Sequence, residues 1–216
     1  MKLKQFVEKF GRPYSEELGI DLSACNPAEI CKWFLASILF AARINETIAK
    51  ETYKEFERRG ILKPVEILDS GWGGLVEILD AGGYVRYDSK TADKLLEVFG
   101  NLQALHNGDM NELHETAKDP KDLEEKIKAL GKGIGGVTVS IFLREMRCCW
   151  EKADPQPTPL VRAAMKNLGI TDLRGFSKEK DCDLVKLETA LLRLSKSYCR
   201  RKRCGECFVV ELCRKS

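Results

Sequence analysis

The sequence has no long hydrophobic run and nothing that resembles a signal peptide. Its main apolar stretch, residues 33–42, is too short to cross a bilayer and is followed by Arg43. The first residues, Met-Lys-Leu-Lys-Gln-Phe-Val-Glu, lack the continuous apolar core of a secretory leader. These absences argue against the membrane and secreted classes, so we expect a cytoplasmic protein.

The net charge is also small, and histidine is rare. The 36 basic and 33 acidic side chains leave a formal net charge of +3. A charge this small does not by itself indicate a nucleic-acid partner, because such binding depends on a local basic patch. The two histidines, His106 and His114, have no evident metal-ligand partner in the sequence. At 216 residues, the chain is long enough for one large domain or two small ones.

Repeats, low-complexity tracts and strand-like alternation are absent, and helical periodicity dominates instead. It predicts an all-α protein of about ten short helices. Asn26 followed by Pro27 is a favourable helix start, and the apolar helix after it is expected to lie centrally in the fold. We expect glycines at residues 71–74 to separate two helices. Residues 106–120 are expected to form a loop with one helical turn.

Residues 121–146 combine two helical segments with a glycine-rich turn between them. Gly133 and Gly135 flank one apolar residue, so the backbone can turn tightly and expose N–H groups at the start of the next helix. Such a helix start attracts phosphate through its free amides and its dipole. Glycine turns between helices are common, so the pattern alone leaves phosphate binding open. The residues predicted to contact a phosphate are Lys132, Gly133, Gly135, Gly136 and Thr138.

Nine cysteines are many for a reducing compartment, where disulfides are not expected. Four lie near the C-terminal end with the spacing Cys-x4-Cys-x2-Cys-x5-Cys. Four thiolates can hold zinc or a [4Fe–4S] cluster, and the spacing does not separate the two. The predicted ligands are Cys199, Cys204, Cys207 and Cys213. The remaining cysteines, which we expect to be small buried side chains, are Cys25, Cys31, Cys148, Cys149 and Cys182.

The loop between the first two predicted ligands is entirely basic. A basic loop held at both ends by a metal centre suits contact with a phosphate backbone, although a solvated charge run needs no partner. We predict that this loop contacts DNA. Its residues are Arg200, Arg201, Lys202 and Arg203.

Several motifs follow one another in a recognisable order. Residues 39–42 (Leu-Phe-Ala-Ala) end the first apolar helix, and residues 87–92 (Tyr-Asp-Ser-Lys-Thr-Ala) precede a later one. The Gly-Ile-Gly turn at residues 133–135 is followed by Asp154 and then by the cysteine quartet. This order, over nearly the whole chain, resembles the endonuclease III family within the helix-hairpin-helix DNA glycosylase superfamily.

The resemblance implies two all-α domains with DNA bound across the cleft between them. One, residues 25–146, would be a six-helix barrel that includes the hairpin at residues 121–146. The other would combine residues 1–24 and 147–216, with a [4Fe–4S] cluster on the loop at residues 199–213. The implied cofactor is therefore iron–sulfur and not zinc. We expect a monomer whose partner is double-stranded DNA with a lesion or a mismatch.

The activity implied is excision of a damaged or mismatched base after it is flipped out of the duplex. Bifunctional family members carry a lysine nucleophile two residues after the second glycine of the hairpin. Here that position is Val137, which cannot form a Schiff base, so a monofunctional glycosylase that uses water is implied. Asp154 is the predicted catalytic carboxylate, which would stabilise the cationic sugar or orient the water. Thr158, a helix cap before Pro159, competes for that place.

The residue that fills the gap left by a flipped base is often glutamine in this family. Here the match is Ala42 beside Arg43, and the second intercalating position is Arg86. We predict that either arginine fills the gap or stacks on the orphaned base. Two alternatives stay open: a non-catalytic DNA-binding or damage-sensing protein on the same scaffold, and a glycosylase with AP-lyase activity from a displaced lysine such as Lys132 or Lys152. The sequence does not identify the base.

Overall fold

The computed structural model describes residues 2–214, and every regular element in that range is helical. The expected all-α class is therefore confirmed. The chain forms two compact units. We call Leu18–Pro155 the central unit, after its place in the sequence, and Met1–Glu17 together with Gln156–Ser216 the terminal unit. Within residues 2–214, none of the helices is both long enough and apolar enough to span a bilayer.

The unit boundaries differ from the predicted barrel at residues 25–146. Leu18 and Leu22 are buried ahead of the first long helix, and Trp150 is buried after the last one. The Trp150 ring contacts Phe142 at 5.4 Å between centroids. The segments on both sides of the expected barrel therefore bury side chains and belong to the central unit.

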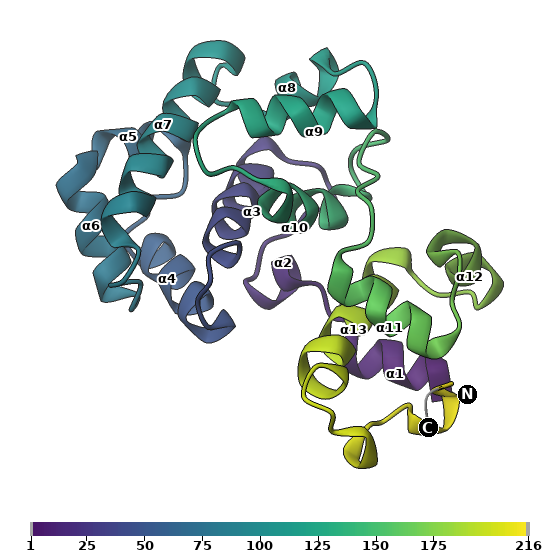
Figure 1. Ribbon diagram of the computed structural model, residues 1–216. Coiled ribbons are helices and arrows are strands. Elements are labelled where there is room, and N and C mark those ends of the chain that lie inside the picture. Colours follow the sequence, from purple (N-terminus) through teal and green to yellow (C-terminus); the bar gives the residue numbers. More distant parts are fainter. Residues whose placement is uncertain (1, 215–216) are drawn as a thin grey trace. The chain divides into compact units, whose positions relative to one another are not determined.

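The central unit is built around one apolar helix, as the sequence predicted. Its helices are α3 (Pro27–Phe40), α4 (Glu46–Arg58), α5 (Pro64–Asp69), α6 (Gly71–Ala81), α7 (Asp88–His106), α8 (Met110–Thr116), α9 (Pro120–Ala129) and α10 (Gly136–Met146) (Figure 1). Helix α3 contacts α4, α8 and α10. The Asn26 side chain accepts a hydrogen bond from the N–H of Ala28 at 2.9 Å, which confirms the predicted cap. A helix that contacts three others sets their positions.

Two contacts anchor α10 to α3. The Trp33 Nε1–H donates to the carbonyl of Phe142 at 3.1 Å, and both side chains are fully buried. The rings of Phe34 and Phe142 lie 5.1 Å apart in an edge-to-face arrangement. The second helix of the predicted hairpin is thus part of the core, which leaves its N-terminal end as the part that can meet a ligand.

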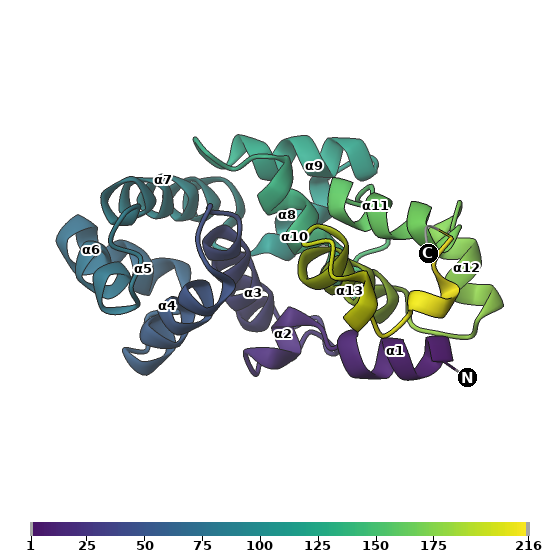
Figure 2. The same ribbon diagram turned by 60° about the horizontal axis from the view of Figure 1, so that its bottom comes forward.

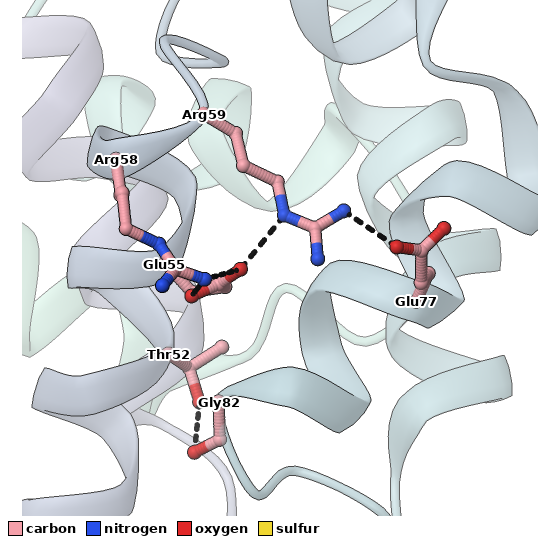
Figure 3. A network of polar contacts seen from close by, with 6 residues as sticks. All are labelled: Thr52, Glu55, Arg58, Arg59, Glu77 and Gly82. Carbon is pink, nitrogen blue, oxygen red and sulfur yellow. Dashed lines mark hydrogen bonds and ion pairs between the residues drawn. The ribbon is translucent and has the colours of Figure 1, made fainter.

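Polar contacts join α4 to α6 (Figure 3). The Arg59 guanidinium donates to Glu55 at 2.7 Å and to Glu77 at 2.9 Å, and the Thr52 hydroxyl donates to the carbonyl of Gly82 at 3.2 Å. Glu77 is exposed, so its ion pair contributes little to stability. A β-carbon on Gly82 would lie 2.4 Å from the Cα of Thr52. The two helices therefore approach so closely that only glycine fits there.

Two sequence expectations need correction in this unit. Helix α6 begins at Gly71, whose φ of +61° makes the corner after α5, so residues 72–74 lie inside the helix. The expected loop at residues 106–120 contains the seven-residue helix α8. Met110 and Leu113 are buried in that helix. Burial of these apolar side chains stabilises a helix that the polar sequence around them does not predict.

The terminal unit is assembled from both ends of the chain. Its helices are α1 (Lys2–Phe10), α2 (Tyr14–Glu17), α11 (Pro159–Leu168), α12 (Leu173–Glu179) and α13 (Leu184–Leu194). Helix α13 contacts α1, α11 and α12 (Figure 2). The Arg193 guanidinium lies 4.6 Å from the ring centroid of Tyr14 and donates to the carbonyl of Phe10 and the carboxylate of Glu17. Arg193 thereby links α13 to α1 and α2.

Only one of the five cysteines outside the C-terminal quartet is buried. Cys31 is buried, as expected, and its thiol donates to the carbonyl of Leu62. Cys148 is exposed, and Cys25, Cys149 and Cys182 are half-buried. The expectation of buried thiols is therefore wrong for four of them, because these residues lie in turns and loops outside the α-helices.

Candidate nucleic-acid interface

The predicted hairpin is present between α9 and α10. Ile134 donates its N–H to the carbonyl of Gly131 at 3.2 Å and is buried, which closes the turn on the core. Gly133 has a φ of +84°, a conformation that favours glycine. Gly135 is the N-cap of α10 and has no side chain to accept from the first amides. Those amides therefore point out of the helix end without a side-chain cap.

Side chains of helix α7 pack against the backbone of this hairpin. The Asn101 side-chain amide donates to the carbonyl of Leu130 at 2.9 Å. A β-carbon on Gly131 would lie 2.7 Å from Cγ2 of Val98. Close packing of the hairpin backbone on α7 thus requires glycine at this position as well.

Lys94 completes this support, and sequence reasoning missed it. Its Cε lies 2.7 Å, and its Nζ 3.3 Å, from the position of a β-carbon on Gly133. Positions 94, 98 and 101 fall on one face of a helix, which was the available signal. Burial lowers the pKa of the Lys94 ammonium. The hairpin therefore has a partly desolvated amine directly beside its central glycine.

Four of the five residues predicted to contact a phosphate are exposed, and one is buried. Lys132, Gly133, Gly135 and Gly136 are exposed, and a β-carbon on either Gly135 or Gly136 would meet nothing within 4 Å. Thr138 is only 2% exposed, so its side chain packs inside the unit. The structure thus groups four of the five predicted residues at one open surface. DNA contact by any of them remains a prediction.

Val137, where the resemblance would place a lysine nucleophile, is open to solvent. Val137 lies in the first turn of α10 and is 62% exposed. Two glycines with open space around them precede this valine. Its exposed side chain therefore does not pack in the core. It also has no amine, so no Schiff base can form from this side chain.

Asp154 lies at the C-terminal end of the central unit. Its carboxylate is half-buried, and the neighbouring Ala153 is buried. Its N–H donates to the carbonyl of Lys152 at 3.0 Å. Thr158, in contrast, belongs to the terminal unit and caps α11 by accepting from the N–H of Val161. Thr158 is therefore the cap that the sequence predicted, and Asp154 lies on a loop ahead of that helix.

The loop that leads to Asp154 is fixed to α8. The Trp150 Nε1–H donates to Oδ1 of Asn111 at 2.8 Å, and its ring stacks on His114 with centroids 4.8 Å apart. The Lys152 ammonium donates to the carbonyl of His114 at 3.1 Å. Burial, followed by the charge of Lys152, lowers the pKa of His114. Trp150 is thus held by its packing and its hydrogen bond, so its ring is not free to stack on a flipped base.

The two arginines predicted to fill the gap left by a flipped base, Arg43 and Arg86, are both exposed residues of the central unit. Arg43 follows the end of α3, and Arg86 precedes α7. The Arg86 guanidinium lies 5.7 Å from the ring centroid of Tyr87. Stacking on a base or insertion into DNA by either arginine stays a prediction.

The cysteine quartet lies in a segment that buries few side chains. The π-helix η1 (Ser195–Cys199) ends at the first cysteine, and the short 3-10 helices η2 (Cys204–Glu206) and η3 (Val210–Leu212) separate the others. Burial raises the pKa of the Cys207 thiol, and the charges of Cys199, Cys213 and Cys204 raise it further.

The donor set fits an iron–sulfur or zinc centre chemically, because all four groups are thiols. In the part of the chain that the structure describes, no three histidine, cysteine or acidic side chains are arranged to hold one metal ion. The coordination itself therefore stays a prediction. Between the first two cysteines, all four basic residues are exposed, and Arg203 also pairs with Glu206.

No protein-family model and no curated protein matches this sequence. We therefore base the function on the chemistry of the hairpin, Asp154 and the cysteine quartet.

Proposed function

We propose that this protein is a monofunctional DNA glycosylase that hydrolyses the N-glycosidic bond of a damaged or mismatched base. The observation that carries this proposal is the open end of α10. Gly135 and Gly136 present an uncapped helix N-terminus there, and the Lys94 amine lies beside Gly133. A phosphate oxygen is the ligand that suits amides, a helix dipole and an ammonium together.

Asp154 supplies the carboxylate for the reaction. As the bond to the base breaks, positive charge develops on the sugar, and a fixed carboxylate stabilises it or orients the attacking water. Hydrogen bonds from Trp150 and Lys152 to α8 hold the loop before Asp154 in place, which favours a fixed position for this group. Val137 offers no amine, so water is the nucleophile.

The cysteine quartet holds a [4Fe–4S] cluster in this proposal. Four thiolates complete the ligand set of such a cluster, whose role here is to fix the basic loop at residues 200–203. Iron and acid-labile sulfide analysis of protein purified without oxygen tests the cofactor. A brown protein with both elements supports it, whereas a colourless protein with stoichiometric zinc would exclude it.

The activity is tested on duplexes with uracil, hypoxanthine, alkylated purines, oxidised bases and mismatches. We expect release of a base from at least one of them, and a loss of about 100-fold or more in Asp154→Asn. Glu151→Gln, a neighbouring exposed carboxylate on the same loop, is the matched control and should keep full activity. DNA binding should be retained in both variants. A fully active Asp154→Asn protein would remove Asp154 from the mechanism.

A second candidate is a non-catalytic DNA-binding or damage-sensing protein. Two observations favour it: the exposed valine at position 137, and the cap of α11 provided by Thr158 and not by an aspartate. Binding to lesion-containing DNA without release of any base would support this candidate over the glycosylase.

Lyase activity from Lys132 or Lys152 is tested separately by borohydride trapping on abasic DNA, which would capture the covalent intermediate.

A further inference from the structure

Cys25 and the adjacent pair Cys148 and Cys149, from distant parts of the sequence, meet at one carbonyl oxygen. The Leu22 carbonyl accepts the N–H of Cys25 at 3.2 Å and the thiol of Cys149 at 2.9 Å. The Cys148 thiol lies 3.8 Å from the same oxygen. All of these residues belong to the central unit, so the grouping is internal to one compact body.

The sulfurs are also close to one another. The Sγ atoms of Cys148 and Cys149 lie 3.9 Å apart, and the shared Leu22 carbonyl places the Cys149 thiol next to the backbone of Cys25. A disulfide needs about 2 Å between sulfurs, so the thiols must move closer before a bond forms. Cys25 has a φ of +52°, in a loop before α3, and Cys149 lies in the turn after α10. Neither residue is held inside an α-helix, so both can adjust.

We propose that Cys25 and Cys149 form a reversible disulfide when the protein meets a hydroperoxide, with Cys148 as the thiol that reacts first. Cys148 is the exposed member of the three. Burial raises the pKa of the Cys149 thiol, which keeps that group protonated and disfavours it as the first nucleophile.

The chemistry balances with one hydroperoxide. The Cys148 sulfur attacks the peroxide, forming an S–O bond and breaking the O–O bond, and the product is a sulfenic acid plus an alcohol or water. The Cys149 sulfur then displaces water from the sulfenic acid to give a disulfide between neighbouring residues. Cys25 attacks the Cys149 sulfur of this strained bond and releases Cys148 as a thiol. Two thiols are oxidised and one peroxide is reduced.

The product would connect the loop before α3 to the segment that runs to Asp154. It would close a covalent ring around most of the central unit, which restricts the unfolded chain and raises the unfolding temperature. This inference does not depend on the glycosylase proposal, because its readouts are a covalent bond and a melting temperature. Activity is not needed to test it.

The experiment treats the purified full-length protein with hydrogen peroxide, then alkylates, digests and maps the peptides by mass spectrometry. We expect a peptide pair linked through Cys25 and Cys149, a raised melting temperature, and reversal of both by dithiothreitol. Cys25→Ser should lose the link, and Cys148→Ser should form it more slowly. Cys182→Ser, a half-buried cysteine of the terminal unit, is the matched control and should behave as the wild type.

Two results would overturn the proposal. One is accumulation of a Cys148–Cys149 disulfide or of sulfinic acid while Cys25 stays reduced. The other is formation of the Cys25–Cys149 link at the wild-type rate in Cys148→Ser, which would remove the first step. Because Cys148 is exposed, its serine variant is expected to fold, and melting under reducing conditions checks each variant.

Discussion

The Cε atom of Lys94 lies 2.7 Å from the point that a β-carbon on Gly133 would occupy, and the backbone there has a φ of +84°. The lysine can move, but the backbone conformation disfavours any side chain. We therefore expect Gly133→Ala to lower the free energy of unfolding by about 1–3 kcal/mol. It should also weaken DNA binding, because the turn that presents the α10 amides would distort. Urea unfolding and fluorescence anisotropy measure the two effects.

Gly135→Ala is the control for this substitution. Gly135 has a φ of −107°, and a β-carbon there would meet nothing within 4 Å. Its alanine variant meets no clash and loses only the N-cap preference for glycine, so it should be destabilised less than Gly133→Ala. Equal stability of the two alanine variants would contradict the strain assigned to Gly133.

Lys94→Met should separate stability from binding. Burial lowers the pKa of Lys94, so folding disfavours its charged form, and this cost is present at neutral pH and disappears only as the pH rises through the lysine range. The methionine variant should therefore be more stable than the wild type at pH 7. Its DNA affinity should fall, and the slope of log K against log salt should decrease by about one phosphate contact.

Lys54→Met is the comparison for that variant, because Lys54 is an exposed lysine on α4. It should change neither the stability nor the salt slope by a comparable amount. A Lys94→Met protein that keeps the wild-type salt slope would show that the Lys94 amine contacts no phosphate.

Val137→Lys should introduce a lyase-type nucleophile. The side chain at position 137 is exposed on the first turn of α10, and a lysine there can form a Schiff base with the aldehyde of an abasic sugar. We expect borohydride to trap a covalent complex with abasic DNA in this variant. Val65→Lys adds the same charge at another exposed valine, on α5, and should give no adduct. Equal trapping by both variants would mean that any added lysine suffices.

Stability should fall on mild acidification because of the two histidines. Burial lowers the pKa of both His114 and His106 below the ordinary value of 6.5. The unfolded chain then binds protons at a higher pH than the folded protein does. The stability gained from the neutral imidazoles is therefore complete above pH 6.5 and is lost as the pH falls through the folded values.

Chemical unfolding between about pH 7.5 and about pH 5.5, above the range of ordinary carboxylates, isolates this effect. His114→Gln should show a shallower decline than the wild type. A variant whose stability falls as steeply as that of the wild type would assign the pH dependence to other groups.

Local sequence signals predicted the helices and turns that depend on neighbouring residues. Asn26 and Thr158 act as caps, and the hairpin lies between α9 and α10, because capping and glycine turns involve contacts within a few residues. The unit boundaries, by contrast, depended on the burial of Leu18 and Trp150, which contacts between distant segments decide. A polar sequence around α8 concealed its two buried residues for the same reason.

The candidate site divides in the same way. Lys94 reaches the hairpin from a different helix, and Cys25 and Cys149 donate to the same Leu22 carbonyl although they are far apart in the sequence. Helical spacing places Lys94 on one face with Val98 and Asn101, but it does not show that this face meets the hairpin, so sequence reasoning found neither contact. Thr138 shows the converse: its place in the motif suggested a ligand contact, while packing buries its side chain.

The pairing of α1 with α13 has a consequence for synthesis on the ribosome. Helix α1 precedes the central unit in the chain and is synthesised before it, whereas α13 follows the central unit. Phe6 and Val7 of α1 are buried in the folded protein, so this apolar face lacks its partner until α13 has been synthesised. The whole central unit can fold during that interval. A nascent chain that stalls before residue 184 would therefore display a folded central unit and an uncovered first helix, a form that chaperones and proteases can distinguish from the finished product.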